Sequence, residues 1–146
     1  MIGITYRPAT VEDVEAIKDV TDLMLAHTGL GLATREKIQA LVASPRTLVQ
    51  IACHGVKIVG FTCGVVHESI FNDRLRVTDI GVFVLEEYRR STIARDLIKQ
   101  LEAWARVQGA EEIWLGQTTG DNPELVAKYY NRLGYKTQGF NSVKEL

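Results

Sequence analysis

The spacing of apolar residues changes once along this sequence, just after Tyr88, and this change constrains the fold more than any other feature. Before it, the stretch from about Leu75 to Leu85 has the period of two that is typical of a β-strand. A strand followed at once by an amphipathic helix predicts a sheet against which that helix packs. The apolar face of the helix, which ends at Gly109, has a period of 3.6 and consists of Ile93, Leu97, Ile98, Leu101, Trp104 and Ala105.

The rest of the chain supplies further strands and helices. A capping-box pattern from Thr10 to Asp13 predicts the start of a helix that runs to about Leu25. Asn122 followed by Pro123 predicts another helix start, with Asn122 as the N-cap. The remaining predicted elements are a strand at 3–7, a helix that carries Ile38, Leu41 and Val42 and ends before Pro45, strands at 48–53 and 56–66 joined by a hairpin at His54-Gly55, a strand at 111–116, the end of the last helix at Gly134, and a final hairpin within 135–146.

This order predicts an α+β (mixed α/β) fold. We expect a central mixed, mostly antiparallel sheet of about six or seven strands flanked by about four helices. The 146 residues match the typical size of one domain, so 1–146 is interpreted as a single domain with one core.

The composition and the absence of common motifs argue against several functions. The formal net charge of −1 argues against nucleic-acid binding, which needs a basic face. No apolar run reaches the roughly 18 residues of a membrane span and the N-terminus has no signal-peptide pattern, so we expect a cytoplasmic protein that does not bind membranes. Phosphate-binding GxxxxGK(S/T) and zinc-binding patterns are absent, and no metal is predicted. Cys53 and Cys63 are interpreted as buried, reduced thiols, and His27, His54 and His67 as polar loop or strand residues.

The connection between the strand and the helix is the candidate binding site. The first main-chain N–H groups of a helix have no partner within the helix, and with the helix dipole they form an anion site. Arg89, Arg90 and Arg95 add positive charge at the same end. The residues therefore leave two interpretations open: a pyrophosphate site, or a solvated helix start with Ser91 or Thr92 as the N-cap.

Two motifs and a hairpin make this sequence resemble the GNAT superfamily of N-acetyltransferases. Arg89 to Ala94 is similar to the family's Gln/Arg-x-x-Gly-x-Gly/Ala loop, which follows its fourth strand and holds the pyrophosphate of coenzyme A. Asn122 to Tyr135 is similar to the segment Asn-x-x-Ala-x-x-Phe/Leu-Tyr-x-x-Leu-Gly-Phe/Tyr, with Asn122 displaced by one residue. The hairpin 53–61 resembles the family's second and third strands. The resemblance implies a GNAT-like three-layer fold and acetyl-CoA as co-substrate, with cofactor-binding residues Val82, Val84, Arg89, Arg90, Ser91, Thr92, Ile93, Ala94, Arg95 and Asn122.

Thr92 stands where the family loop has glycine. If that position needs a positive φ, a β-branched residue is unfavourable there and coenzyme binding is weakened. The chain would then be a catalytically decayed binding module that acts through a protein partner. If glycine serves only for close approach, the hydroxyl of Thr92 could itself bind phosphate.

The resemblance also implies direct acetyl transfer, in a ternary complex, to a primary amine of a small molecule or a protein. A lysine-like amine has a pKa of about 10.4, so only about one in 10³ is neutral near pH 7 and a general base is useful. Asp79 is the first candidate for this base and Glu68 the second, and Tyr130 is the candidate that returns a proton to the leaving thiolate. The acceptor is expected to contact residues from about His27 to Arg35 or Glu36 and the final hairpin, and the family also suggests a homodimer.

Overall fold

The computed structural model describes residues 3–26, 34–116, 122–139 and 142–146. Most boundaries lie within a few residues of those predicted from the sequence. In chain order the elements are β1 (Ile4–Pro8), the 3-10 turn η1 (Val11–Asp13), α1 (Val14–Leu25), α2 (Arg35–Ala43), β2 (Thr47–His54), β3 (Lys57–Glu68), β4 (Leu75–Val84), the 3-10 turn η2 (Glu86–Tyr88), α3 (Ile93–Val107), β5 (Glu112–Trp114) and α4 (Pro123–Arg132).

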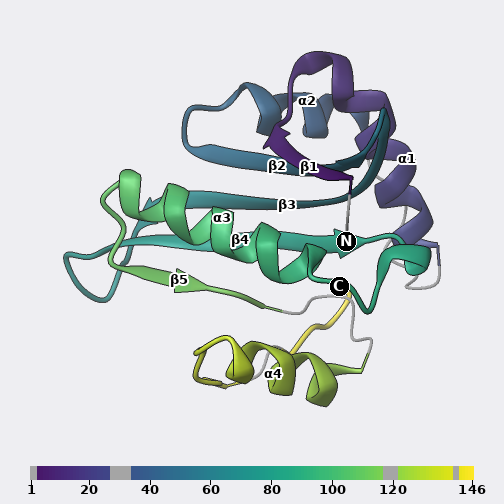
Figure 1. Cartoon of the computed structure of the whole chain (residues 1–146). Helices are drawn as coiled ribbons and strands as arrows, with labels where there is room; N and C mark the ends of the chain where they lie inside the picture. Colours follow the sequence, from purple (N-terminus) through teal and green to yellow (C-terminus); the bar gives the residue numbers. More distant parts are fainter. Residues whose placement is uncertain (1–2, 27–33, 117–121, 140–141) are drawn as a thin grey trace.

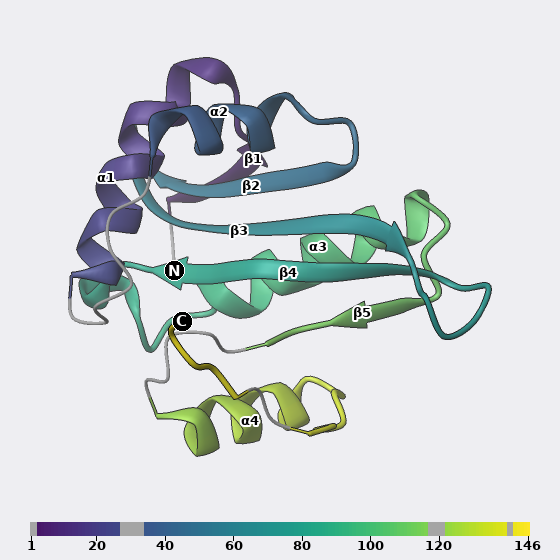
Figure 2. The same ribbon diagram turned by 180° about the vertical axis from the view of Figure 1, so that it is seen from behind.

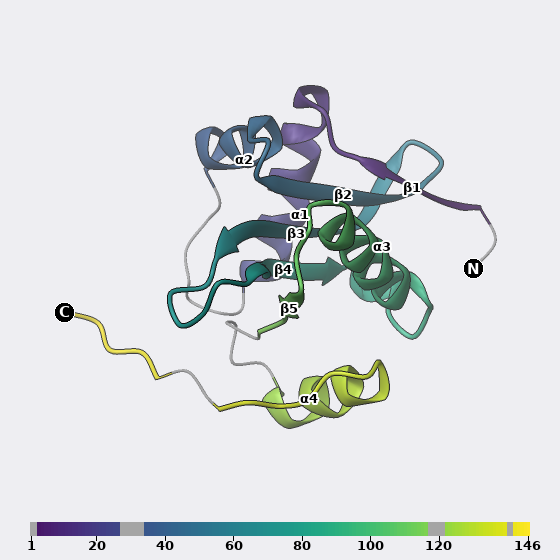
Figure 3. The same ribbon diagram turned by 90° about the vertical axis from the view of Figure 1, so that its left-hand side faces the viewer.

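The elements form three layers around one sheet. Figure 1 shows α3 in front of the sheet, and Figure 2, seen from behind, shows α1 and α2 over the other face. Figure 3 places α4 past β5, at the edge of the sheet opposite β1. This arrangement confirms the predicted α+β class with a mixed sheet.

The strands lie in the order β1-β2-β3-β4-β5. The first four pair antiparallel, and β5 pairs parallel to β4. The β4–β5 pairing involves only residues 76–78 and 112–114. The two strands therefore share one short region and then separate, which leaves one edge of β4 open.

Helix α3 is fixed by a buried apolar face. Ile93, Leu97 and Leu101 have no exposed surface, and Leu101 packs in one cluster with Val77 of β4. Gly64 of β3 lets the helix approach closely, since a Cβ there would lie 2.7 Å from Cδ1 of Leu101. This packing holds the N-terminus of α3 beside the end of β4.

The capping-box residues hold β1 to the first turn. Asp13 accepts hydrogen bonds from the main-chain N–H of Thr10 at 2.8 Å and from the Arg7 guanidinium at 2.7 and 2.9 Å. The hydrogen bond from Arg7 lowers the pKa of Asp13 to about 2. The predicted buried thiols are also confirmed, since Cys53 and Cys63 are buried and free.

The predicted strand count was too high. The described residues contain five strands, and β5 covers three residues of the predicted 111–116. The predicted final hairpin is not formed by residues 135–139 and 142–146, which have no regular secondary structure. A glycine at 139 and a polar 141 suit a turn, but among the described residues no strand lies beside the tail to pair with it. None of the described helices is both long and apolar enough to cross a membrane.

Candidate active site

The fork between β4 and β5 is the centre of the candidate site. Beyond Thr78, β4 has no partner on this side among the described residues. Asp79 is the first residue past the shared region, and its Oδ1 accepts a hydrogen bond of 2.8 Å from the main-chain N–H of Gly116, two residues past the end of β5. The carboxylate therefore holds the two strands together at the point where they separate.

The register of β4 directs the main-chain groups of Val82 and Val84 toward the open edge. Leu85 donates its N–H to the carbonyl of Val59 at 2.9 Å, which makes this pair a hydrogen-bonded one. Hydrogen-bonded and non-hydrogen-bonded pairs alternate along antiparallel strands. Val84, opposite Gly60, and Val82, opposite Thr62, thus present their N–H and C=O groups away from β3. An extended ligand could pair with this edge as a further strand does.

The start of α3 lies directly after η2. Within the described residues, the main-chain N–H groups of residues 90, 91, 92, 94 and 95 have no hydrogen-bond acceptor. The N–H of Ile93 donates to Oγ of Ser91 at 3.3 Å, and the Ser91 hydroxyl donates to the carbonyl of Tyr88 at 2.5 Å. The loop thus offers a group of free donors at the positive end of a 15-residue helix, which is the arrangement that binds phosphate.

The backbone of Thr92 shows whether this position needs a positive φ. Thr92 has a φ of −87°, so the position does not need glycine. The left-handed residue of the loop is Arg90, with a φ of 62°. The conformational argument for a decayed coenzyme site therefore does not apply to this chain.

The hydroxyl of Thr92 is engaged within the protein. It donates to Oδ2 of Asp96 at 3.0 Å, and the Tyr6 hydroxyl donates to the same oxygen at 2.9 Å. Burial raises the pKa of Tyr6, and the hydrogen bond to Asp96 raises it further, to about 12. Thr92 would have to leave Asp96 in order to donate to a phosphate.

The three arginines of the loop differ in their surroundings. Arg89 donates from Nε to the carbonyl of Val84 at 3.1 Å, so it ties the loop to the end of β4. Arg95 makes a 3.4 Å ion pair with Asp96. Arg90 is exposed and has no ion pair in the described part of the chain. Of the three guanidinium groups, that of Arg90 is therefore the one most available to an anion.

The pKa of the Asp79 carboxyl group is raised. Burial raises its pKa to about 6, and the hydrogen bond from Gly116 opposes part of this rise. Its partner in the β3 register, Gly64, faces Leu101, so Asp79 lies on the α3 side of the sheet. A carboxylate with a pKa near the working pH suits proton transfer.

Tyr130 of α4 lies in electrostatic range of Asp79. Burial raises the pKa of Tyr130 well above its ordinary value, and the negative charge of Asp79 raises it further. The Tyr130 ring lies 6.0 Å from that of Tyr135, whose hydroxyl donates to Glu102 of α3 at 2.5 Å. The structure thus places the two predicted catalytic side chains within electrostatic range of each other and ties the segment after α4 to α3.

Other predicted residues are not brought to the fork. Asn122 precedes α4 as predicted but is left-handed, with a φ of 51°, and its side chain makes no capping hydrogen bond. Glu68 is exposed at the last position of β3, opposite Leu75, because the long β3 carries it to the far end of the sheet. His27 and the segment that follows it up to residue 33 lie outside the described residues.

Two contacts that anchor the site have no signal in the sequence. Tyr6 reaches Asp96 across 90 positions of sequence, and His54 Nδ1 lies 2.8 Å from the Tyr88 hydroxyl. The first contact joins β1 to the first turn of α3, and the second joins β2 to η2. Of the contacts around this loop, the sequence predicts only that of Thr92 with Asp96, because residues four apart on a helix are neighbours.

A splayed pair of strands beside a helix N-terminus with free amides could accommodate an extended, anionic ligand. The family model for the acetyltransferase (GNAT) family matches residues 19–135, and the chain belongs to this family of acyltransferases. A streptothricin acetyltransferase of Streptomyces lavendulae is 33% identical over 100 residues, which are 68% of this chain and 49% of the relative. The chain thus spans about half the length of that relative.

Solved structures share the fold at low sequence identity. An aminoglycoside acetyltransferase from an uncultured soil metagenomic sample, in complex with sisomicin, has a TM-score of 0.79 at 16% identity and covers 99% of this chain and 97% of its own. A transcriptional regulator from Bacillus halodurans C-125 has a TM-score of 0.81 at 20% identity, with 98% and 99% covered. These likenesses support the fold alone.

Proposed function

We propose that this chain, as one catalytic domain, transfers an acetyl group from acetyl-CoA to a primary amine, directly and in a ternary complex. The observation that carries the proposal is the group of free main-chain N–H donors at residues 90–95, held beside the open edge of β4. The amine-bearing antibiotics named for similar proteins make a small-molecule acceptor the first choice and a protein amine the second.

The residues present fit coenzyme A. The free amides and Arg90 would hold its diphosphate, and the edge groups of Val82 with the N–H of Val84 would pair with the amides of its pantetheine arm, since the Val84 carbonyl accepts from Arg89. The carboxylate of Asp96 opposes an anion here, but its charge is partly offset by Arg95 at 3.4 Å. When bound, the coenzyme supplies an acetyl group activated as a thioester.

Two side chains of this protein would then each transfer a proton. A bond forms between the acceptor nitrogen and the acetyl carbonyl carbon, the carbon–sulfur bond breaks, and sulfur keeps the electron pair. Asp79 would accept the proton that leaves the nitrogen, directly or through water, because its pKa of about 6 leaves it mostly ionised at pH 7. Tyr130 would donate a proton to the thiolate, because its raised pKa keeps its hydroxyl protonated.

Thermal melting with acetyl-CoA tests the coenzyme site. A ligand at about 100 times its Kd stabilises by about 2.7 kcal/mol, which is a rise in Tm of roughly 5–11 °C for a domain of this size. Arg90→Glu should remove most of this rise. Arg46→Glu, the same exchange at an exposed arginine before β2, is the matched control and should keep it. No rise at millimolar acetyl-CoA would refute the proposal.

A further inference from the structure

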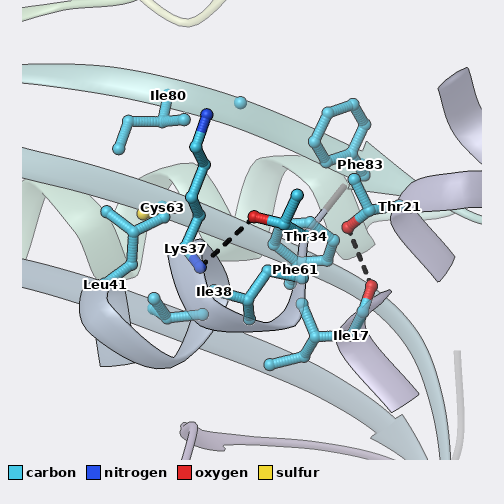
Figure 4. A pocket seen from close by; sticks show the side chains of 12 residues that line it. Ile17, Thr21, Thr34, Lys37, Ile38, Leu41, Phe61, Cys63, Ile80 and Phe83 are labelled. Carbon is cyan, nitrogen blue, oxygen red and sulfur yellow. Dashed lines mark hydrogen bonds between the residues drawn. The ribbon is translucent and has the colours of Figure 1, made fainter. Parts of the chain in front are cut away.

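A pocket lined mainly by apolar side chains lies on the other face of β4 from the coenzyme site. It has a volume of about 210 Å³ and is enclosed by α1, α2 and the sheet (Figure 4). Ile17, Ile38, Phe61 and Phe83 form much of its wall. Among the described residues that line it, the single charged one is Lys37, and none is acidic.

A β-bulge connects this pocket to the fork. The β3–β4 register shifts so that Cys63 pairs with Gly81 and Gly64 with Asp79, which leaves Ile80 unpaired. A bulge re-aims the side chain of its extra residue. Ile80 and Gly81 line the pocket, whereas Asp79 next to them lies on the α3 side. The pocket residue Ile80 and the fork residue Asp79 are therefore neighbours in sequence that lie on opposite faces of β4.

The size and polarity of the pocket limit what enters it. An apolar cavity of roughly 150 Å³ accommodates benzene, so this pocket has room for one aromatic ring or one branched aliphatic chain. A charged group would lose its hydration there without a partner. Lys37 adds a positive charge at the rim, where its side chain extends toward Ile80 in Figure 4, and it has no ion-pair partner among the described residues.

We infer that the acceptor is a primary amine with a single apolar body and no second positive charge. This inference rests on the proposed function and names its substrate class. The body occupies the pocket, and the amine reaches the fork around the open edge of β4, because the ring of Phe83 covers Gly81. Two effects disfavour polycations: a second charged group would lose its hydration in the pocket, and Lys37 would repel it.

Acceptor kinetics test the inference directly. The release of coenzyme thiol from acetyl-CoA is measured with 2-phenylethylamine, 3-methylbutylamine, 1,4-diaminobutane and sisomicin. We expect kcat/KM for the first two amines to exceed that for the diamine and for sisomicin by at least tenfold. Equal or higher values for the two polycations would overturn the inference and leave the proposed acetyl transfer intact.

Binding without acetyl-CoA separates the inference from the proposed function. Millimolar 2-phenylethylamine should raise the Tm of the protein alone, and 1,4-diaminobutane should not. If acetyl-CoA gives no shift but 2-phenylethylamine does, the transfer proposal fails and the pocket is still supported. If neither apolar amine shifts the Tm while acetyl-CoA does, the pocket inference fails.

One substitution changes the pocket without disturbing the core. Ile80 is 46% exposed, so Ile80→Asp should fold, and it should lower the ratio of kcat/KM for 2-phenylethylamine over 1,4-diaminobutane at least tenfold. Ile70→Asp, at an 89% exposed isoleucine in the β3–β4 turn, is the matched control and should leave the ratio within twofold. Because the ratio is measured within each variant, a partly unfolded fraction cancels.

The charge at the rim is tested in the same way. Lys37→Glu should lower the same ratio severalfold by attracting the diamine. Lys99→Glu, at an exposed lysine of α3 on the other face of the sheet, should not change it. A ratio unchanged in both Ile80→Asp and Lys37→Glu would overturn the inference.

Discussion

The two ends of β4 have opposite roles. From Leu75 to Thr78 the strand is paired with β3 and, from Arg76 on, with β5, and Val77 within it has no exposed surface. From Asp79 to Val84 it is paired with β3 alone among the described residues, and it carries a carboxyl group with a pKa raised to about 6.

Under the proposed function, this difference lets a single strand serve both stability and chemistry. The paired end packs against Leu101 and so holds α3 in place. The open end leaves main-chain groups and one acid for a ligand, beside the helix start that the paired end has positioned. Removing side chains from the two ends should therefore separate stability from activity.

Asp79→Asn should give the largest effect on activity. Loss of a general base lowers kcat/KM by about 10²–10⁴-fold. The wild-type kcat/KM should fall with a slope of one below pH about 6, the pKa of Asp79, and the variant should lose this inflection. Steady-state kinetics between pH 5 and 8 measure both. Glu68→Gln, at the exposed end of β3, is the control and should match the wild type.

The same substitution should stabilise the fold near neutral pH. An acid whose pKa is about 6 folded and 3.8 unfolded binds its proton more tightly in the fold, so its contribution to stability falls as pH rises through about 4–6. Asn cannot ionise and keeps an oxygen for the N–H of Gly116. The variant should therefore melt a few degrees higher at pH 7 and show little difference at pH 4. An unchanged Tm at pH 7 would contradict the burial argument.

Val77→Ala tests the paired end and should give the next largest effect. Its buried methyl groups pack against α3, and their loss costs about 2 kcal/mol, a fall in Tm of roughly 5–10 °C. The kcat of the folded enzyme should stay within about twofold, because the open end is unchanged. A large loss of kcat with a normal Tm would reverse the comparison.

Tyr130→Phe should lower kcat by about tenfold, since a thiolate with an ordinary thiol pKa of about 8.5 leaves moderately well without an acid. The Kd of acetyl-CoA, from the same melting titration, should stay within about twofold. Tyr129→Phe on the same helix, with its ring 6.2 Å from that of Tyr130, is the matched control. An unchanged kcat in Tyr130→Phe would remove this tyrosine from the mechanism.

Much of this division was predictable from local pattern. The change of period at Tyr88 located the strand, the loop and α3, because each depends on residues close in sequence. The boundary of β5 and the tail were not predictable in the same way. A strand needs a neighbour, and the apolar pattern of 111–116 does not reveal that β5 pairs with β4 over three residues only.

The sequence predicted where the candidate site lies, but not the contacts that its residues make. The loop sequence indicated an anion site, but it could not distinguish which residue is left-handed or that the Arg89 side chain is bound to the Val84 carbonyl. The contact of Tyr6 with Asp96 and the pocket under α1 and α2 depend on segments far apart in the chain. Long-range packing decides these features.

The smallest expected effect concerns strain at the open end. Arg90, with its φ of 62°, and Asn122 are the non-glycine residues with positive φ in the described ranges, and Arg90 lies in the loop of the candidate site. An L-residue in this conformation costs about 1–2 kcal/mol relative to glycine. Arg90→Gly should therefore be about 1 kcal/mol more stable than Arg90→Ala in denaturant unfolding, since both lose the same charge. Acetyl-CoA should bind both variants equally, because the two differ only in backbone preference.

If Arg90→Ala were the more stable of the two, the left-handed conformation would not be a property of the free protein. If glycine alone restored the affinity for acetyl-CoA, the conformation of residue 90 rather than its charge would hold the diphosphate.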